Sequence, residues 1–427
     1  MPENTYSTHI PAPRAILFSA PSSDIADHDV QASLNELGSL LAGLGSEACA
    51  RLIQRLHKAP GPLVLGAGKI DELKSLLEAE QEKGADKIVL VYDGELTPGQ
   101  QRHLARAFAT EVLDRTQVIL RIFSARARTP TALLEIEAAS LKYEASRIID
   151  DDALVDKQAG GGGRGGKGNT STELRKQELR KRLAEIRVEL ERAERGQMAR
   201  RQRRAEVRKV ALVGYTNAGK SSWMRVLTGS SVMVQDALFA TLETTVRKLH
   251  PETKPSIVAT DTVGFLRNLP NHLLASFRST LAEALDAHLL LIVIDGSDPQ
   301  WRTHLGTTRD VLEKAGGGDR PVIYLVNKLD QMSDEACAAL RAELADALFV
   351  SSRANEDIAQ VHATIVAFFD QQLSEAELRV PYTQAALRAE ILAQANVIAE
   401  DFDEEGGLMR LRAEASAVAR WRERLDS

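Results

Sequence analysis

Residues Val207 to Ser222 read V-R-K-V-A-L-V-G-Y-T-N-A-G-K-S-S, an apolar run that leads into a loop bounded by glycines and closed by Lys-Ser. The pattern G-x-x-x-x-G-K-S places backbone N–H groups around phosphate oxygens, while its lysine neutralises the β- and γ-phosphates and its serine hydroxyl can bind Mg²⁺. An ordinary glycine turn is disfavoured, because a strand precedes the loop and a helix can start at Ser222. We therefore predict a nucleoside triphosphate site at Gly214, Tyr215, Thr216, Asn217, Ala218, Gly219, Lys220 and Ser221.

Two downstream segments predict the parts that respond to the γ-phosphate. Threonine hydroxyls occur where switch I of a GTPase completes the Mg²⁺ shell, in the segment Phe239, Ala240, Thr241, Leu242, Glu243, Thr244 and Thr245, and one of them must serve as the ligand. A predicted strand at Ile257–Thr260 ends in Asp261-Thr262-Val263-Gly264. Its carboxylate can hold Mg²⁺ through a water, and its glycine N–H can contact the γ-phosphate. We expect Lys220 and Gly264 to act directly on the phosphate that is transferred.

The base-recognition elements follow in the same order as in a GTPase. Asn327-Lys328-Leu329-Asp330 comes after an apolar run, Val322–Val326, which we predict to be a buried strand. An aspartate there can accept hydrogen bonds from the N1–H and the 2-amino group of guanine, whereas adenine has no matching donors. A last base-contacting turn is expected at Ser351, Ser352 and Arg353. These elements in this order predict that the nucleotide is GTP rather than ATP.

Two residues predict an unusual hydrolytic site. The residue after Gly264 is Phe265, at the position where Ras-like enzymes carry the glutamine that orients the attacking water. Asn217 occupies a P-loop position where certain GTPases bind a K⁺ ion that replaces an arginine finger. We predict K⁺-stimulated hydrolysis, and the alternative is that Asn217 only stabilises the loop.

Composition limits the class of protein. The chain has 427 residues, of which 44% are hydrophobic, and this is enough for two to four domains with their own cores. Cys49 and Cys337 form no CxxC pair and no secretory leader is evident, so we expect a reducing, cytoplasmic setting. The longest apolar run, 287–294, is far shorter than the roughly 20 residues of a membrane span. The formal net charge of −6 argues against indiscriminate nucleic-acid binding by the whole molecule, so any such contact should be concentrated in one segment. We expect no DNA partner. We expect a monomer.

The N-terminal part predicts a small α/β domain over residues 14–128, after a tail at 1–13. We expect strands at Ala15–Phe18, Pro62–Leu65 and Lys87–Tyr92, at least partly parallel, with a helix over Val30–Leu44 and another from Pro98. The turn Gly66-Ala67-Gly68-Lys69 lacks the spacing of a P-loop and is interpreted as a tight turn between strand and helix.

Residues 129–206 predict an antiparallel helical hairpin. Thr129-Pro130 is a cap followed by proline at the first helical position, and apolar residues then recur at steps of four and three. Thr170-x-x-Glu173 is interpreted as a capping box that opens a second helix with the same rhythm, on the order of 50 Å long. The apolar positions are Leu134, Ala138, Leu141, Ala145 and Ile148 in the first helix, and Leu179, Leu183, Ile186, Leu190 and Ala193 in the second.

The hairpin is the basic part of an acidic protein. Its tip loop, residues 157–170, is rich in glycine, and residues 173–209 contain 14 Lys and Arg against 7 Glu. A solvated charged helix face is the simpler alternative. Backbone phosphates of RNA are the natural partner of so much positive charge, and the few aromatic residues argue against single-strand stacking. The candidate RNA contacts are Arg164, Lys167, Arg175, Lys176, Arg180, Lys181 and Arg182.

The remaining chain predicts two further domains. The P-loop and base motifs belong to a GTPase domain over 207–373, and residues 374–427 form a small α+β domain for which we expect the order strand, helix, strand, helix. The fold class is thus α/β and multidomain.

The chain resembles the HflX family of the Obg-HflX group of translational GTPases. The resemblance runs from Ala15 to the C-terminus and is strongest before Asp330. It is carried by the following stretches: Gly66–Lys69, Asp93–Gln101, Val112–Thr116, Ile122–Thr129, Gly214–Ser221, Phe239–Leu242 and Asp261–Phe265.

This resemblance implies a protein that binds the large ribosomal subunit, inserts the hairpin tip toward the peptidyl-transferase region and splits stalled or idle ribosomes, with GTP hydrolysis releasing it. It also implies that Thr241 is the switch I ligand of Mg²⁺. The residues themselves leave a second function open, a GTP-gated scaffold that regulates a protease or membrane complex. A third alternative, an ATP-dependent RNA-remodelling activity, has only the Gly66–Lys69 turn in its favour.

Overall fold

The chain divides into two compact units in a computed structural model of the protein. The first unit consists of residues 1–195, 237–242 and 268–277, and the second of residues 196–236, 243–267 and 278–427. The structure describes residues 13–57, 61–84, 87–158, 168–202, 207–230, 239, 245–262, 264–267 and 285–426. Among these residues, no helix combines the length and apolar content that crossing a bilayer requires.

The first unit contains a four-stranded sheet in the order β2-β1-β3-β4, with parallel pairing throughout. This agrees with the expected parallel α/β domain. Apolar side chains of strands and helices, among them Phe18, Leu90 and Leu104, form its core. The elements are β1 (Arg14–Ser19), α1 (Asp27–Ala42), β2 (Glu47–Ile53), α2 (Ala67–Glu82), β3 (Ile88–Tyr92), α3 (Pro98–Phe108), β4 (Glu111–Asp114) and α4 (Arg115–Arg126).

The strand expected at Pro62–Leu65 is wrong. This segment forms a turn before α2, and Val64 has a φ of 65°, a left-handed conformation that a strand cannot contain. Val64 and Leu65 are nevertheless buried. A short apolar run of this kind is typical both of a buried strand and of a buried turn, so the sequence alone does not distinguish them. The missing strand is β2, whose sequence E-A-C-A-R-L-I buries only one residue and therefore carries little hydrophobic signal.

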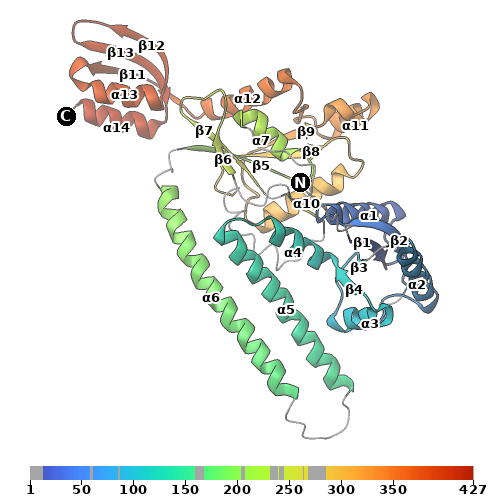
Figure 1. Ribbon diagram of the computed structural model, residues 1–427. Helices are drawn as coiled ribbons and strands as arrows, with labels where there is room; N and C mark the ends of the chain where they lie inside the picture. The colour runs from blue at the N-terminus through green and yellow to red at the C-terminus, as the bar shows by residue number, and fades with distance from the viewer. Residues whose placement is uncertain are drawn as a thin grey trace, which may run out of the picture. The chain divides into compact units, whose positions relative to one another are not determined.

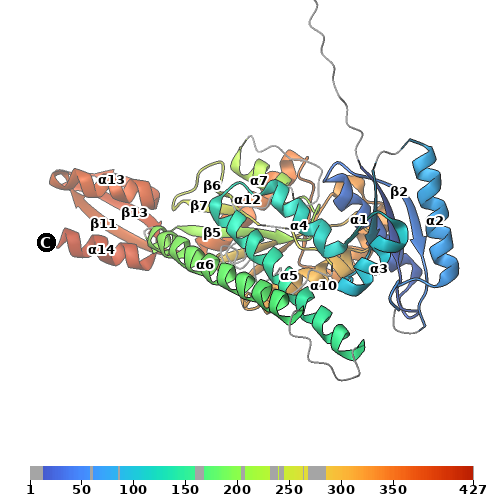
Figure 2. The ribbon, with the colours of Figure 1, turned by 60° about the horizontal axis from the view of Figure 1, so that its bottom comes forward.

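A long helical hairpin follows the sheet (Figure 1). It consists of α5 (Pro130–Gln158) and α6 (Gly168–Gln202), which lie side by side in both ribbon views (Figure 2). As expected, α5 begins at Pro130, and the Thr129 hydroxyl accepts a hydrogen bond from the Ala132 N–H at 3.3 Å. The cap expected at Thr170 is wrong, because α6 already begins at Gly168. Glycine is tolerated there, since the first N–H groups of a helix need no partner within it.

Ion pairs join the two helices of the hairpin along their length. Arg175 donates to Glu144 at 2.7 and 3.1 Å, and Arg182 donates to both carboxylate oxygens of Glu137 at 2.6 and 2.8 Å. Of the predicted apolar seam, Leu179 is buried between these pairs and Ile186 is buried one turn beyond Arg182. The seam and the paired charges together fix the register of α6 against α5.

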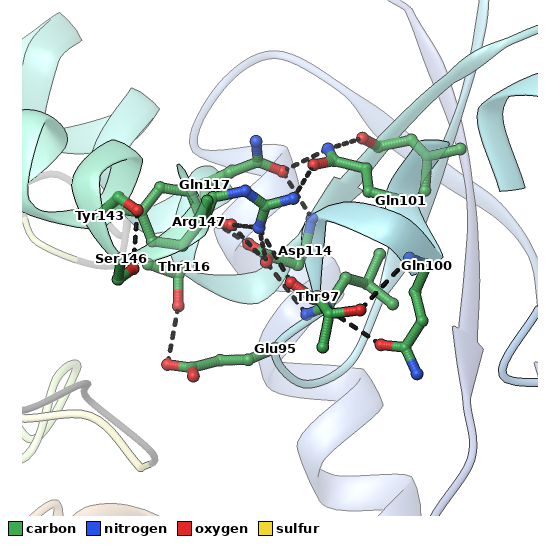
Figure 3. Close-up of polar contacts among 12 residues, drawn as sticks. Glu95, Thr97, Gln100, Gln101, Asp114, Thr116, Gln117, Tyr143, Ser146 and Arg147 are labelled. Carbon is green, nitrogen blue, oxygen red and sulfur yellow. Dashed lines mark hydrogen bonds and ion pairs between the residues drawn. The ribbon is translucent and has the colours of Figure 1, made fainter. Parts of the chain in front are cut away.

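A buried carboxylate anchors α5 to the sheet (Figure 3). Asp114 ends β4 and caps α4, where its Oδ1 accepts from the Gln117 N–H at 2.9 Å. Its Oδ2 accepts from the Leu96 N–H at 3.2 Å and from the Tyr143 hydroxyl of α5 at 2.5 Å. Burial, and then the charge of Asp114, raises the pKa of Tyr143 well above its usual value. The phenol therefore remains a donor to this carboxylate.

Arg147, one helical turn further along α5, completes the cluster (Figure 3). It donates to the Leu96 carbonyl at 2.9 Å and to the Gln101 side chain, and its guanidinium lies 4.9 Å from the centre of the Tyr143 ring. The Arg147 guanidinium is also 3.5 Å from Asp114. Backbone and side-chain groups of three segments thus converge on one face of α5, and they define the direction in which the hairpin leaves the sheet.

The second unit contains a six-stranded sheet in the order β10-β9-β8-β5-β7-β6, in which only β6 is antiparallel. Strands β5 and β8 are buried along almost their whole length, as expected for the centre of a sheet covered on both faces. Its elements are β5 (Arg208–Gly214), α7 (Lys220–Thr228), β6 (Thr245–Lys248), β7 (Ile257–Asp261), β8 (Leu289–Asp295), α10 (Trp301–Lys314), β9 (Val322–Asn327), η1 (Leu329–Gln331), α11 (Asp334–Glu343), β10 (Leu348–Phe349) and α12 (Asn355–Asp370).

A second, antiparallel sheet with the order β11-β13-β12 follows in the same unit. Helices α13 and α14 cover one of its faces, with Trp421 fully buried in the shared core. The expected order of strand, helix, strand, helix missed β12, which buries none of its side chains and pairs only with β13. The elements are β11 (Ser374–Pro381), η2 (Tyr382–Gln384), α13 (Ala385–Gln394), β12 (Asn396–Phe402), β13 (Gly406–Ala413) and α14 (Ala415–Leu425).

Replacement of Asp114 by alanine should loosen α5 from the sheet. The substitution would leave the Leu96 N–H and the Tyr143 hydroxyl without their acceptor and the Arg147 charge half-buried without its partner. We expect a loss of about 3 kcal/mol, or roughly 100-fold faster hydrogen–deuterium exchange of α4 and α5 amides. The exposed Asp71 of α2 is the matched control, and Asp71→Ala should change exchange free energies by less than about 0.5 kcal/mol. Equal exchange in both variants would contradict the anchoring role of Asp114.

Candidate functional site

The predicted nucleotide-binding residues lie at the carboxyl ends of three parallel strands. Gly214 ends β5, Asp261 ends β7 and Asn327 ends β9. The strand register brings these ends together, because Leu212 of β5 pairs with Asp261 and Gly214 pairs with Val293 of the intervening β8. The carboxyl edge of a parallel α/β sheet is where such folds bind their ligands.

Two glycines give the phosphate loop its shape. Gly214 has a φ of 148°, and a Cβ atom on it would lie 2.4 Å from the Val293 carbonyl oxygen. Gly219 has a φ of 99°, and a Cβ atom there would lie 2.1 Å from the Asn327 side-chain nitrogen. Both the backbone conformation and the close approach exclude any larger residue. The loop then enters α7 at Lys220, as the motif predicts.

Lys220 is the buried cation of the site. Its ammonium group donates to the Tyr215 carbonyl at 2.7 Å, and only 6% of the residue is exposed. Burial lowers the pKa of Lys220 to about 8, although the carboxylate of Asp261 opposes this shift. A buried ammonium group that has given up its hydration is well placed to bind phosphate oxygens, which replace the lost water.

Ser221 and Asp261 provide oxygen atoms suited to Mg²⁺. The Ser221 hydroxyl donates to Asp261 Oδ2 at 2.9 Å, so the two predicted ligands lie side by side. The neighbouring Thr262 has a different role, because its hydroxyl donates to the Leu212 carbonyl at 2.7 Å and ties the end of β7 to β5. Hydroxyl and carboxylate oxygens are the donors that Mg²⁺ prefers, and the pair therefore fits this ion.

The segment after β7 pairs through its backbone with the phosphate loop. The Phe265 N–H donates to the Gly214 carbonyl at 3.1 Å, and the Thr216 N–H donates to the Phe265 carbonyl at 2.9 Å. Gly264 lies against the loop so closely that a Cβ atom on it would be 2.7 Å from the Thr216 methyl group and 2.9 Å from the Lys220 ammonium. Gly264 therefore lies next to Lys220, the other residue that the sequence predicts to contact the γ-phosphate.

The predicted base-contacting residues form a connected group. The Asn327 amide donates to the Ala218 carbonyl at 2.8 Å and accepts from the Ser352 N–H at 3.3 Å. Asp330 accepts from the Ser351 hydroxyl at 2.7 Å and from the Arg353 guanidinium at 3.2 Å. The hydrogen bond from Ser351 is the main reason that the pKa of Asp330 lies below its usual value. The ionised form of the carboxylate, which can only accept hydrogen bonds, is thus favoured.

The structure also describes Asn217 and Phe239, which the sequence predicts for the nucleotide site. Asn217 is exposed and has a left-handed φ of 61°. Phe239 is buried in the first unit, where its ring packs edge-on against Phe123 of α4 at 4.5 Å between centroids. The other residues predicted for the nucleotide site lie outside the described part of the chain: Ala240, Thr241, Leu242, Glu243 and Val263.

The structure adds supporting residues that the motifs did not reveal. Asp295, at the end of β8, accepts from the Lys328 ammonium at 2.6 Å, and Asp357 of α12 accepts from the Ser351 N–H at 2.7 Å. The Tyr215 ring stacks on His304 of α10 with 3.7 Å between centroids, and its hydroxyl accepts from the Arg267 N–H at 2.9 Å. Of these residues, only Asp295 could have been predicted from the sequence, because it follows an apolar run that is typical of a buried strand and so falls at the carboxyl edge of the sheet.

Comparison with known families divides the chain into three matched parts. A family described as GTP-binding GTPase N-terminal matches residues 31–124, and one described as GTP-binding GTPase Middle Region matches residues 126–204. A third, described as 50S ribosome-binding GTPase, matches residues 209–328. The last match includes the phosphate loop, Asp261 and Asn327.

Individual relatives cover nearly the whole chain. A GTPase HflX from Gluconacetobacter diazotrophicus is 40% identical over 97% of this chain and 98% of its own length. A GTPase HflX from Escherichia coli is 35% identical over 93% of this chain and 92% of its own length. Among solved structures, a GTP-binding protein from Sulfolobus solfataricus in complex with GDP covers 83% of this chain and 99% of its own, with 22% identity and a TM-score of 0.44.

Replacement of Asp330 by asparagine should change the base that the site binds. The NH₂ group of asparagine is a donor, whereas the carboxylate oxygen that it replaces is an acceptor. It would therefore face the N–H donors of guanine and could not bond to them. We expect GTP affinity to fall about 100-fold, because each charge-assisted hydrogen bond contributes about 1.5–3 kcal/mol. Binding of xanthosine triphosphate, which has a carbonyl in place of the 2-amino group, should increase. Titration calorimetry with both nucleotides measures the change, and unchanged base preference would contradict this role of Asp330.

Proposed function

The chain belongs to the HflX family of GTPases, and on this basis we propose that it acts on the large ribosomal subunit. In this proposal the GTP-bound protein binds the subunit through its basic hairpin and promotes the splitting or rescue of ribosomes, and hydrolysis to GDP and phosphate releases it. The protein would work as a monomer in the cytoplasm. The observation that carries the proposal is that the described part of the hairpin presents exposed basic residues without ion pairs, Arg180 and Lys181.

The ion pairs of the hairpin separate its basic residues into two groups. Arg175 and Arg182 pair with glutamates of α5, and Lys176 lies 3.5 Å from Glu173 of its own helix. Arg180 and Lys181 are exposed, and the described part of the hairpin offers them no ion pair. Positive charge that is not neutralised within the protein remains available for phosphates. We therefore assign the RNA contacts of the described hairpin first to Arg180 and Lys181.

The tip of the hairpin is part of the same proposal. Arg164 and Lys167 lie outside the residues that the structure describes, between the ends of α5 and α6. The family resemblance implies that the tip approaches the peptidyl-transferase region, and its glycines would allow the backbone to adapt to RNA.

The proposed metal ion is Mg²⁺, held by Ser221 directly and by Asp261 through a water. A third ligand, Thr241 of switch I, is implied by the family resemblance. When bound, the ion would neutralise charge that develops on the β- and γ-phosphate oxygens. Lys220 and the Gly264 N–H would bind the same phosphates, and Asp330 would hold the guanine.

A K⁺ ion is the proposed second cation. Asn217 is exposed on the phosphate loop, whereas Thr216 and Ala218 on either side of it are buried. Its φ of 61° lies in the left-handed region. An amide oxygen there could bind a monovalent cation beside the phosphates, where a positive charge stabilises the transition state.

The RNA-binding proposal predicts that two substitutions weaken ribosome binding. Arg180→Glu with Lys181→Glu should lower the affinity for large ribosomal subunits at least about ten-fold in the presence of a non-hydrolysable GTP analogue. The slope of log affinity against log salt should decrease by about 2, because two phosphate contacts are lost. Co-sedimentation with purified subunits at several salt concentrations measures both quantities.

The matched control removes the same charge elsewhere in the first unit. Lys74→Glu with Arg106→Glu changes two exposed residues of α2 and α3 and should leave subunit binding unchanged. Absence of subunit binding by the unmodified protein would overturn the proposal and favour the alternative of a GTP-gated protein scaffold. If both double substitutions weakened subunit binding equally, binding would depend on the total charge of the protein and not on Arg180 and Lys181.

The K⁺ proposal predicts different hydrolysis rates in KCl and NaCl. At equal ionic strength, we expect hydrolysis to be about ten-fold or more faster in KCl, because a bound cation stabilises charge in the transition state. Asn217→Ala should abolish this difference, whereas Asn396→Ala, at an exposed position in β12, should preserve it. Phosphate release under single-turnover conditions measures the rates. Equal rates in KCl and NaCl for the unmodified protein would contradict the proposed K⁺ site.

A further inference from the structure

The side chain of Thr216 has an unusual environment in the phosphate loop. The residue is only 6% exposed, and its hydroxyl oxygen is buried without a hydrogen-bond partner among the residues that the structure describes. Its backbone N–H, in contrast, donates to the Phe265 carbonyl at 2.9 Å. Buried polar groups in folded proteins are nearly always paired, and an exception at a functional site points to a partner that binds during function.

The neighbours of Thr216 indicate what that partner is. An ideal Cβ atom on Gly264 would lie 2.7 Å from the Thr216 methyl group, 2.8 Å from its Cα and 2.9 Å from the Lys220 ammonium. The Thr216 side chain thus lies beside Gly264 and in the neighbourhood of the Lys220 ammonium, the two groups expected to contact the γ-phosphate. Its unpaired hydroxyl belongs to the same loop that would hold that phosphate.

The residue at the usual water-orienting position has no polar side chain. Phe265 is 3% exposed, and both its N–H and its carbonyl are paired with the phosphate loop. Its ring cannot accept a hydrogen bond from water in the way that a glutamine amide does. Hydrolysis therefore needs another group that aligns the water with the phosphorus atom.

We propose that the Thr216 hydroxyl orients the attacking water and replaces the missing glutamine. A hydroxyl has one donor and two acceptor positions, so it can accept from the water and donate to a γ-phosphate oxygen. The water oxygen forms a bond to the γ-phosphorus, and the bond between that phosphorus and the β–γ bridging oxygen breaks. The proton of the water passes to a phosphate oxygen, and the products are GDP and inorganic phosphate. Thr216 has the same number of protons before and after the reaction.

The proposal concerns the GTPase activity alone and is independent of the ribosomal partner. It is tested with Thr216→Val, which has the same shape without the hydroxyl, and with Thr216→Ser, which keeps the hydroxyl. Single-turnover hydrolysis of bound GTP should be about ten-fold or more slower in Thr216→Val and within about three-fold of the original rate in Thr216→Ser. The affinity for GDP, which lacks the γ-phosphate that the hydroxyl contacts, should be unchanged in both.

A second readout separates this role from a structural one. Removal of a buried, unpaired hydroxyl should leave the melting temperature of the nucleotide-free protein equal or higher, so that Thr216→Val is a stable but slow variant. Thr308→Val is the matched control, because the buried Thr308 hydroxyl is paired with the His304 carbonyl within α10. It should hydrolyse GTP at the original rate. Unchanged hydrolysis in Thr216→Val, or equal slowing in the valine and serine variants, would overturn the proposal.

Discussion

The nucleotide site depends on how closely the backbone of β5 approaches β8 at Gly214. No side chain fits there, because a Cβ atom would lie 2.4 Å from the Val293 carbonyl oxygen. This approach lets the chain leave the sheet, turn through the phosphate loop and enter α7 at the buried Lys220. The carboxyl ends of β7 and β9 are fixed against the same point by strand register, so Asp261 and Asn327 arrive at the loop without any further constraint.

The hairpin is held by two kinds of charged interaction with different physical consequences. Asp114 is fully buried and accepts hydrogen bonds from several segments, so its loss would leave unpaired groups in the interior. The pairs Arg175–Glu144 and Arg182–Glu137 lie at the surface, where each contributes little to stability. Burial of Leu179 and Ile186 supplies the stability, and the surface pairs specify the register. They also reduce the number of basic residues available to a partner, a distinction that charge counting along the sequence does not make.

The sequence was most informative where function demands particular residue types at fixed spacing. The motifs predict that the phosphate loop, Asp261 and the turn at Asn327 belong to one site, because phosphate and guanine chemistry leaves few alternatives, and the structure brings these residues together. It was least informative where tertiary packing decides. The apolar segment Pro62–Leu65 forms a buried turn, whereas the polar β2 and β12 are strands because neighbouring strands pair with them. The supporting contacts of Asp357, His304 and Tyr143 come from helices far away in sequence, and no local pattern announces them.

Phe265 acts on the site through its backbone, whereas the glutamine at this position in Ras-like enzymes acts through its side chain. Its N–H and carbonyl bond to Gly214 and Thr216, so the start of this segment is held against the phosphate loop like an added strand. Burial of the ring reinforces that pairing, because release of the segment would expose it to water. A polar side chain at this position would weaken the pairing if it had to remain free for water. The division of tasks is therefore consistent: Phe265 fixes the position of Gly264, and polar contact with the reacting water falls to the loop itself.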